Sequence, residues 1–218
     1  MQNGKRIGCS WSGGKDSCYA LITAAEQGAI PAVLVNMMNE NGKISRSHGL
    51  PFSLLQKQAE AMELPILAFP TSWNDYEDNF VNALLEIKSK HGVETMVFGD
   101  VDLQEHRDWE EKVCLNAGIE AMLPLWQYER KALLLEMLNK GMKAMIVSCN
   151  PVLGEAFLGR VMDYDIIPEL EERGVDVCGE NGEFHTVVID CPLFKRSVDL
   201  PRYSKTEHGG YYFLQWEV

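Results

Sequence analysis

Apolar residues follow two different spacings along this chain. Short apolar runs, rich in β-branched residues, alternate with longer stretches in which apolar positions recur at helical spacing. This alternation is typical of a parallel sheet flanked by helices. The short runs predict strands near residues 6–11, 32–38, 66–69, 95–98 and 144–147.

The clearest helical pattern runs from residue 74 to residue 91. It places on one face Tyr76, Phe80, Ala83, Leu84 and Ile87. Such a face is what an amphipathic helix packs onto a sheet, and the following Gly92 is a typical end for it. Further helices are expected at 17–27, 54–62, 108–117 and 129–139, the last two followed by Gly118 and Gly141.

The alternation loosens after about residue 151 into Gly-rich and Pro-punctuated sequence. A strand is expected at 186–190, and Gly209-Gly210 predicts a hairpin. The sequence therefore predicts an α/β fold: a domain with a parallel sheet over residues 1–125, and a smaller C-terminal α+β lobe over residues 126–218. Ligands of such sheets bind at the carboxyl ends of the strands where the strand order reverses, so the functional motifs should converge there.

The first candidate motif lies between the first strand and the first helix. It reads Ser12-Gly13-Gly14-Lys15-Asp16-Ser17, with Ser10 just before it. The glycines allow consecutive N–H groups to point at an anion, and the following helix adds the positive end of its dipole. Lysine and serine side chains complete a cradle for pyrophosphate.

The spacing of this loop differs from that of the nucleotide P-loop, in which four residues separate the first glycine from Gly-Lys-Ser/Thr. Here the lysine directly follows the glycine pair, and an aspartate follows the lysine. This order resembles that of the PP-loop ATP pyrophosphatases, which cleave ATP between the α and β phosphates. The alternative is a tight connection that opens a helix and binds nothing.

Other candidates follow later strands. Gly99 and Asp100 end the strand at 95–98, where a ribose or Mg²⁺ could be held. Asp100 is preferred to Asp102 for this role, and helix capping is the alternative. Arg107 could grip a phosphate or carboxylate, or pair with Glu110 on a solvated face.

An acidic loop gives the strongest signal after the first motif. Glu180 and Glu183 stand three residues apart on a Gly-broken loop before the strand at 186–190. Such carboxylates could bind ammonium, steer an amine or hold Mg²⁺, whereas an exposed charged loop is the alternative. His185 titrates near neutrality. His48 and Arg160 are further candidates; a lone histidine is more often structural than catalytic, and a structural role is the alternative for both.

Composition restricts the class of protein. The chain has 218 residues and a net charge of −12, which argues against strong nucleic-acid binding because phosphate backbones demand clustered Lys and Arg. No segment approaches the ~20 apolar residues of a membrane span, and no export signal is evident. The six cysteines lie far apart without a Cys-x-x-Cys pair, so we expect reduced, mostly buried thiols and a cytoplasmic protein.

Together the motifs resemble the diphthine–ammonia ligase family of N-type ATP pyrophosphatases. The matching segments are Ser12-Gly13-Gly14-Lys15-Asp16-Ser17, Gly99-Asp100, Pro124-Leu125-Trp126, Leu158-Gly159-Arg160, Gly179-Glu180-x-Gly182-Glu183-Phe184-x-Thr186 and Pro192-Leu193-Phe194. The resemblance implies a Rossmann-like HUP domain and a smaller C-terminal lobe. It also implies an ATP-dependent amidation that releases AMP and pyrophosphate, with diphthine on elongation factor 2 as the acceptor. Some eukaryotic members of the family are much longer than this chain, so we expect it to have no extra C-terminal domain.

On this basis three sets of site residues are expected. The catalytic set is Lys15, Asp16, Glu180 and Glu183, with ammonia guided by the two glutamates. The nucleotide set is Ser10, Ser12, Gly13, Gly14, Lys15, Asp16, Ser17, Gly99 and Asp100, with Mg²⁺ at Asp16 and Asp100. The acceptor set is His48, Arg107, Arg160, Asn181, His185 and Thr186.

Asn181 and His185 stand where the family usually has a glycine and an acid, so acceptor recognition is expected to depend on them. Other acceptors therefore stay open: a small-molecule carboxylate, a tRNA base, or none, in a regulator that binds ATP or AMP without turnover. The expected partners are ATP, ammonia and elongation factor 2, with no membrane; a homodimer is left open.

Overall fold

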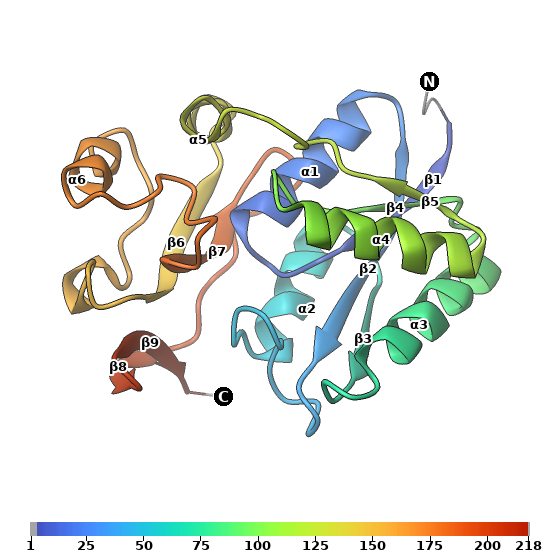
Figure 1. Ribbon diagram of the computed structural model, residues 1–218, viewed down its shortest axis with the longest axis horizontal. Coiled ribbons are helices and arrows are strands. Elements are labelled where there is room, and N and C mark those ends of the chain that lie inside the picture. The colour runs from blue at the N-terminus through green and yellow to red at the C-terminus, as the bar shows by residue number, and fades with distance from the viewer. Residues whose placement is uncertain (1–3, 218) are drawn as a thin grey trace.

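The computed structural model describes residues 4–217 and contains two sheets that lie side by side (Figure 1). The first is parallel and has the order β3-β2-β1-β4-β5. Its strands are β1 (Arg6–Ser10), β2 (Ile30–Met38), β3 (Ile66–Pro70), β4 (Thr95–Val97) and β5 (Glu120–Met122). Order and direction confirm the predicted Rossmann-like domain. Strands β2 and β3 lie on one side of β1, and β4 and β5 lie on the other, so the strand order reverses between β1 and β4.

Helices cover both faces of the parallel sheet. The helices on the sheet are α1 (Lys15–Glu26), α2 (Phe52–Ala61), α3 (Tyr76–His91) and α4 (Gln104–Ala117). Helix α5 (Arg130–Asn139) follows β5 in the chain and lies at the boundary with the C-terminal lobe (Figure 1). Apolar residues of α3 and α4 form one core on the sheet. Those of α1, α2 and α5 form a second core, which continues without interruption into the C-terminal lobe. The two lobes are therefore packed together by burial of apolar surface.

The smaller sheet is antiparallel and has the order β7-β6-β9-β8. Its strands are β6 (Lys143–Cys149), β7 (Phe184–Asp190), β8 (Tyr203–His208) and β9 (Tyr211–Trp216). A single-turn helix η1 (Glu155–Phe157) and α6 (Ile166–Glu172) connect β6 to β7. Gly209 and Gly210 both have positive φ, 60° and 83°, which confirms the predicted hairpin.

The run at 144–147 forms the strand predicted there, β6, in the antiparallel sheet of the smaller lobe. One strand of the parallel sheet was not predicted. The fifth parallel strand is β5, which has three residues and an exposed first position. A strand this short, paired only with β4, carries too few alternating positions to produce a pattern.

Helix ends and thiols follow the expectations. Gly92 and Gly118 end α3 and α4 with left-handed φ values of 63° and 65°. All six cysteines are free and buried. Within residues 4–217, no helix combines the length and the apolar character needed to cross a bilayer.

Candidate functional site

The first motif and Gly99 meet at the reversal point of the sheet. β1 leads into the loop that opens α1, and β4 leads into Phe98-Gly99-Asp100. A Cβ on Gly99 would lie 2.6 Å from the Ser17 nitrogen and 2.7 Å from the Asp16 carbonyl carbon. Only glycine lets the end of β4 approach the first turn of α1 this closely. This edge is where ligands of open α/β sheets bind.

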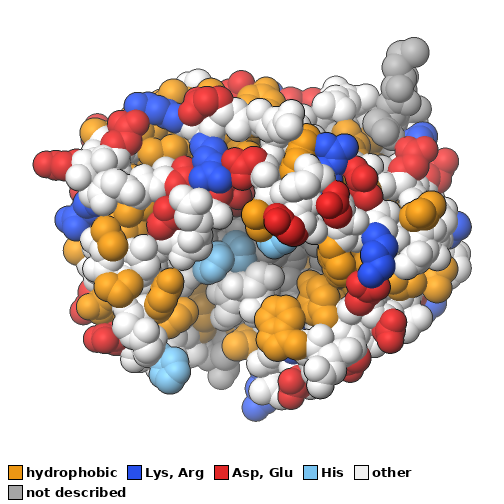
Figure 2. Space-filling view, viewed as in Figure 1, with side chains coloured by type: hydrophobic (Ala, Val, Ile, Leu, Met, Phe, Trp, Pro, Cys, Tyr) orange, Lys and Arg blue, Asp and Glu red, His pale blue; other side chains and the backbone are white. Residues whose placement is uncertain are grey.

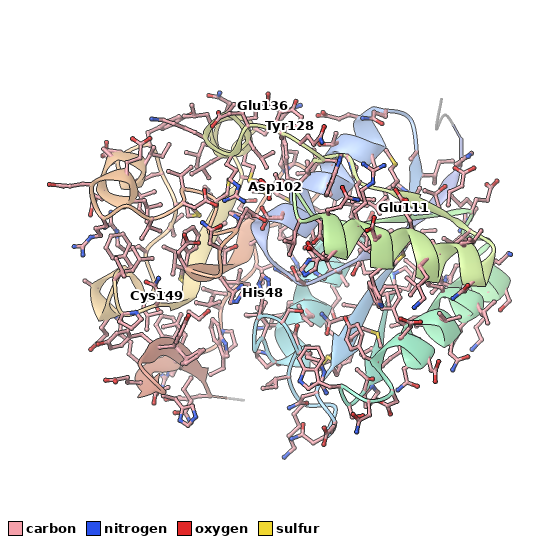
Figure 3. All side chains as sticks on the ribbon, viewed as in Figure 1. His48, Asp102, Glu111, Tyr128, Glu136 and Cys149 are labelled. Carbon is pink, nitrogen blue, oxygen red and sulfur yellow. The ribbon has the colours of Figure 1, made fainter. Side chains whose placement is uncertain are left out.

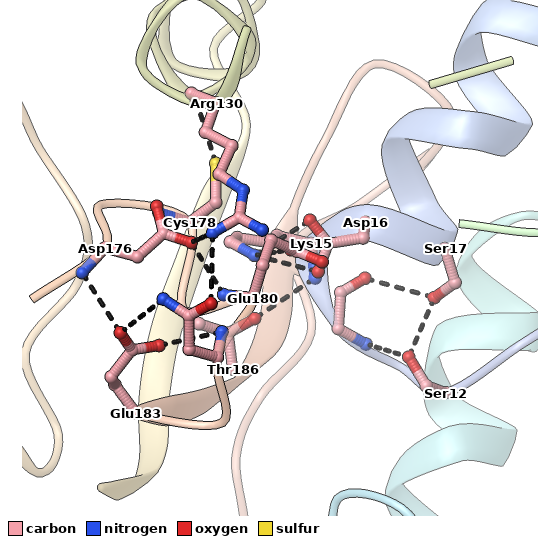
Figure 4. Close-up of polar contacts among 12 residues, drawn as sticks. Ser12, Lys15, Asp16, Ser17, Arg130, Asp176, Cys178, Glu180, Glu183 and Thr186 are labelled. Atoms are coloured by element: carbon pink, nitrogen blue, oxygen red, sulfur yellow. Dashed lines mark hydrogen bonds and ion pairs between the residues drawn. The ribbon is translucent and has the colours of Figure 1, made fainter. Parts of the chain in front are cut away.

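Internal hydrogen bonds give the loop its shape (Figure 4). The Gly14 amide donates to Ser12 Oγ at 3.2 Å, and the Ser12 and Ser17 hydroxyls lie 3.0 Å apart. Ser17 Oγ also donates to the Gly14 carbonyl at 3.2 Å. Gly13 has a φ of 83°, a left-handed conformation that other residues rarely adopt. Both serines and the first turn of α1 are thereby held on the same side of the loop.

The C-terminal lobe is hydrogen-bonded directly to this loop. The Lys15 amide donates to Thr186 Oγ1 at 3.1 Å, and the Val188 amide donates to the Gly13 carbonyl at 2.9 Å. His48 Nδ1 lies 2.9 Å from the Thr186 carbonyl. The loop that follows β1 is therefore also held by β7 of the other lobe.

Gln58 reinforces this contact, and sequence reasoning missed it. Its buried amide donates to the carbonyls of Gly13 at 3.0 Å and Val188 at 2.7 Å. The indole N–H of Trp11 donates to Gln58 Oε1 at 2.9 Å. The one signal in the sequence was a polar residue at an apolar position of the helix at 54–62.

Lys15 forms the charged centre of the site. Its side chain is buried, and Nζ lies 2.8 Å from both carboxylate oxygens of Asp16 and 3.7 Å from Glu180 Oε1. Burial alone would lower the pKa of Lys15, but the two carboxylates reverse that effect and raise it. Lys15 is therefore a fixed cation at the loop.

Glu180 is the titratable group of this centre. Burial, followed by repulsion from Asp16, raises the pKa of Glu180 to about 7, although Lys15 acts in the opposite direction. A carboxylate with such a pKa exchanges protons near neutrality, which is the property of a general base.

Glu183 has a different position from Glu180. Its carboxylate accepts hydrogen bonds from the amides of Asp176 (3.2 Å) and Asn181 (3.0 Å) and from the Asn181 side chain (3.0 Å). Burial alone would raise the pKa of Glu183, but the hydrogen bonds, led by that of the Asn181 side chain, hold it below the usual value. Glu183 therefore shapes the acidic loop from within, while Glu180 faces Lys15 (Figure 4).

Arg130, at the start of α5, anchors the acidic loop and was also missed. It forms a two-pronged ion pair with Asp102 at 2.8 Å and donates to Asp176 at 2.7 Å. Its backbone carbonyl accepts from Cys178 Sγ at 2.9 Å. Nothing in its local sequence distinguished it from an ordinary exposed arginine. Asp102 is thus engaged with Arg130, whereas Asp100 faces the cavity.

Asp100 belongs to a second acidic cluster. His106 Nδ1 donates to its Oδ1 at 2.7 Å. Burial alone would raise the pKa of Asp100, but hydrogen bonds from His106 and Glu110 lower it. Burial and the neighbouring Asp100 raise the pKa of Glu110 to about 11. Glu110 is therefore protonated at neutral pH beside the ionised Asp100.

These groups surround one cavity of about 530 Å³, a size typical of small-molecule sites. One end is polar and the other is aromatic. The polar end includes Ser10, Ser12, Lys15, Asp16, Ser17, Gly99, Asp100 and Glu180, and the aromatic end includes Tyr76, Phe80, Phe98 and Trp109. Figure 2 shows the opening as a hollow with histidine side chains at its centre and acidic side chains along its upper rim.

The acceptor candidates divide into two groups. His48, His185 and Thr186 line the cavity, and His48 lies between the lobes in Figure 3. Arg107 instead pairs with Glu111 at 2.7 Å and stacks on Trp126. Arg160 forms a two-pronged pair with Glu169 at 2.7 Å. These two arginines and Asn181 are not among the described residues that line the cavity.

The arrangement suits a triphosphate and a reaction that moves protons. A fixed cation, two hydroxyls and a helix N-terminus converge at the polar end, which favours phosphate. A carboxylate with a raised pKa lies within 4 Å of that cation. The aromatic end offers flat apolar surfaces of the kind on which a purine ring stacks.

Comparison with protein families gives two matches that together span most of the chain. The model of the diphthamide synthase N-terminal domain matches residues 5–121, and that of the diphthamide synthase C-terminal domain matches residues 129–218.

Individual relatives agree with the family models. The chain is 28% identical to a diphthine–ammonia ligase of Homo sapiens, over 88% of this chain and 82% of that protein. It is 27% identical to the zebrafish (Danio rerio) diphthine–ammonia ligase, over 86% and 83%. The Schizosaccharomyces pombe enzyme of the same name is 26% identical over 91% of this chain and 36% of its own length. A solved Methanocaldococcus jannaschii protein, a predicted subunit of tRNA methyltransferase, is 14% identical with a TM-score of 0.46, and the match covers 88% of this chain and all of that one.

Proposed function

Since the chain belongs to the diphthamide synthase family, we propose that it is an ATP-dependent amide ligase that converts diphthine to diphthamide. It adenylates the acceptor carboxylate with release of pyrophosphate and then transfers ammonia with release of AMP. The relatives that match it over most of their length are named diphthine–ammonia ligases.

The observation that carries the proposal is the pairing of Lys15 with Glu180. The lysine belongs to the phosphate loop of the first lobe and the glutamate to the acidic loop of the second, and they lie 3.7 Å apart in one cavity. A regulator that binds ATP or AMP without turnover needs only the cation, to hold the phosphates. A ligase needs the cation for the phosphates and a neighbouring base for the amine, and this site has both.

In the first step, an oxygen of the acceptor carboxylate attacks the α phosphorus and the bond to the β phosphate oxygen breaks. Lys15, the hydroxyls of Ser12 and Ser17 and the first turn of α1 stabilise the charge on the departing pyrophosphate. Adenylation is required because an unmodified carboxylate would have to expel oxide, whereas its adenylate expels AMP.

In the second step, the nitrogen of ammonia attacks the acyl carbon and AMP leaves with the carboxylate oxygen attached to its phosphorus. The attacking nitrogen must lose a proton. Glu180 accepts it, because its pKa near 7 leaves a substantial ionised fraction at neutral pH. Asp16 keeps Lys15 in place through its two short contacts, and Glu183 holds the loop that carries Glu180.

Mg²⁺ fits this site as an ion that would bind together with the phosphates of ATP. Within residues 4–217, no group of three or more His, Cys, Asp or Glu residues is arranged to hold a metal, and Mg²⁺ at phosphate sites typically uses one or two carboxylates and water. Asp16 and Asp100 are the carboxylates that would hold it. When bound, the ion would neutralise phosphate charge.

The protein substrate in this proposal is elongation factor 2, the bearer of diphthine. ATP and ammonia are the other two substrates. A cytoplasmic location and homodimerisation stay predictions from the sequence.

An isotope transfer tests the reaction. The acceptor carboxylate is labelled with ¹⁸O, and the products are analysed by mass spectrometry after one turnover. Adenylation predicts one labelled oxygen in AMP for each amide formed. Label in inorganic phosphate would instead indicate an acyl phosphate, and unlabelled AMP would show that the carboxylate is not the nucleophile.

A further inference from the structure

A second cavity, of about 460 Å³, adjoins the nucleotide cavity. It lies between the segment 39–49 of the first lobe and the strands β6, β7 and β9 of the second. The residues that line both cavities are Ser47, His48, Trp73, Gly182, Phe184 and His185. We name this shared set the junction. Anything bound there lies next to the group that reacts in the nucleotide cavity.

Aromatic side chains dominate the junction. The rings of His48 and His185 lie 4.6 Å apart between centroids. Burial, assisted by the other imidazole, lowers the pKa of His48 to about 3, and burial followed by the charge of Lys15 lowers that of His185. Both rings are therefore neutral and present π faces instead of positive charge. Trp73 is 73% exposed, which is unusual for tryptophan and leaves its ring available to a ligand.

The indole of Trp73 already contacts a cation. The guanidinium carbon of Arg46 lies 4.8 Å from the centre of the ring, and the exposure of Trp73 leaves much of the remaining ring surface open to solvent.

The junction is suited to a cation that carries no N–H groups. Among the described residues that line the second cavity, the one acid is Glu183. Its carboxylate is already occupied by three hydrogen bonds from Asp176 and Asn181. On the side of the junction that faces the second cavity, a primary ammonium would lose water without gaining a carboxylate partner. A quaternary ammonium needs no hydrogen bonds and binds to aromatic faces.

We propose that the junction is a binding seat for a quaternary ammonium group that the acceptor carries next to its reacting carboxylate. The inference rests on the proposed function, because diphthine is a carboxylate with a trimethylammonium group on the adjacent carbon. The carboxylate then extends into the nucleotide cavity while the ammonium group contacts Trp73, His48 and His185. The rest of the acceptor lies along the second cavity, which Tyr211 and Phe213 line.

Two small probes of matched shape test the seat. Glycine betaine places a trimethylammonium next to a carboxylate, and 3,3-dimethylbutanoate replaces that group with an uncharged tert-butyl group. Binding of each to the full chain is measured by ligand-observed NMR. A cation–π seat predicts that betaine binds about 2- to 30-fold more tightly than the isostere. Trp73→Leu should abolish the difference, and Trp73→Phe should keep part of it.

Tyr164→Leu is the matched control, because Tyr164 is another exposed aromatic residue and lines neither cavity. It should leave the preference intact. Equal binding of the two probes, binding of neither, or a preference that survives Trp73→Leu would overturn the proposal. These measurements need no turnover. A failure of the proposed function would instead appear in the isotope experiment as AMP without label, so the two failures are distinguishable.

Discussion

The backbone amide of Lys15 donates a hydrogen bond of 3.1 Å to Thr186 Oγ1, which lies 171 positions further along the chain. This bond joins the first residue of α1 to strand β7 of the other lobe. The loop 12–17 and the acidic loop are therefore parts of one site, because β7 directly continues the loop that carries Glu180.

Replacing Thr186 with valine should weaken this connection. The change removes the hydroxyl acceptor at nearly constant volume and leaves a buried N–H without its partner, which costs about 1–3 kcal/mol in the free energy of unfolding. Urea denaturation measures it. Thr206→Val is the control, because Thr206 lies exposed on β8; equal losses in both variants would contradict the role given to Thr186.

Gln58→Met should be destabilising for a related reason. The methionine fills the space but leaves the Val188 carbonyl and the Trp11 indole without their buried partner, at about 1–3 kcal/mol for each unpaired group. The Gly13 carbonyl loses one of its two donors and keeps the Val188 amide. Gln56→Met, on the exposed side of the same helix, should change the unfolding free energy by less than about 0.5 kcal/mol. Indistinguishable denaturation midpoints for the two variants would contradict the role given to Gln58.

Lys15→Met should remove most AMP formation. Loss of one group that stabilises transition-state charge typically lowers kcat about 10²- to 10³-fold. Circular dichroism checks the fold, and Lys112→Met, which alters an exposed ion pair with Glu77, is the control. Near-normal AMP production by Lys15→Met would show that the loop does not activate ATP.

Glu180 predicts a pH dependence of the amide-forming step. Its pKa is raised from 4.5 to about 7. The ionised form of Glu180 is therefore lost as the pH falls through 7, and ionisation is nearly complete above about pH 8. At a fixed concentration of free ammonia, the wild-type rate should therefore rise across this window. Glu180→Gln should be slower by about 10²- to 10⁴-fold and flat over the same range; a variant with the wild-type profile would assign the base elsewhere.

Local patterns were sufficient for much of the fold and for one half of the site. The apolar runs predicted β1 to β4, and the loop 12–17 with Gly99 marked the edge of the sheet at which the first cavity lies, because strand topology places these segments together. The short β5 and the fully exposed β8 carry no alternation that could be recognised.

The other half of the site depends on contacts between distant segments. Gln58 and Arg130 contact residues 28 to 130 positions away, and no local spacing encodes such partners. The same holds for the division of labour between Glu180 and Glu183: both are acids of one loop, and only the position of Lys15 separates them.

The central claim is tested most directly by measuring AMP, pyrophosphate and amide together. The full chain is incubated with ATP, Mg²⁺ and ammonium, with and without elongation factor 2 that carries diphthine. The account predicts equal amounts of all three products, and only when the factor is present. ATP binding with no release of pyrophosphate that depends on the factor would contradict it, and the acceptor would then have to be sought among other carboxylates.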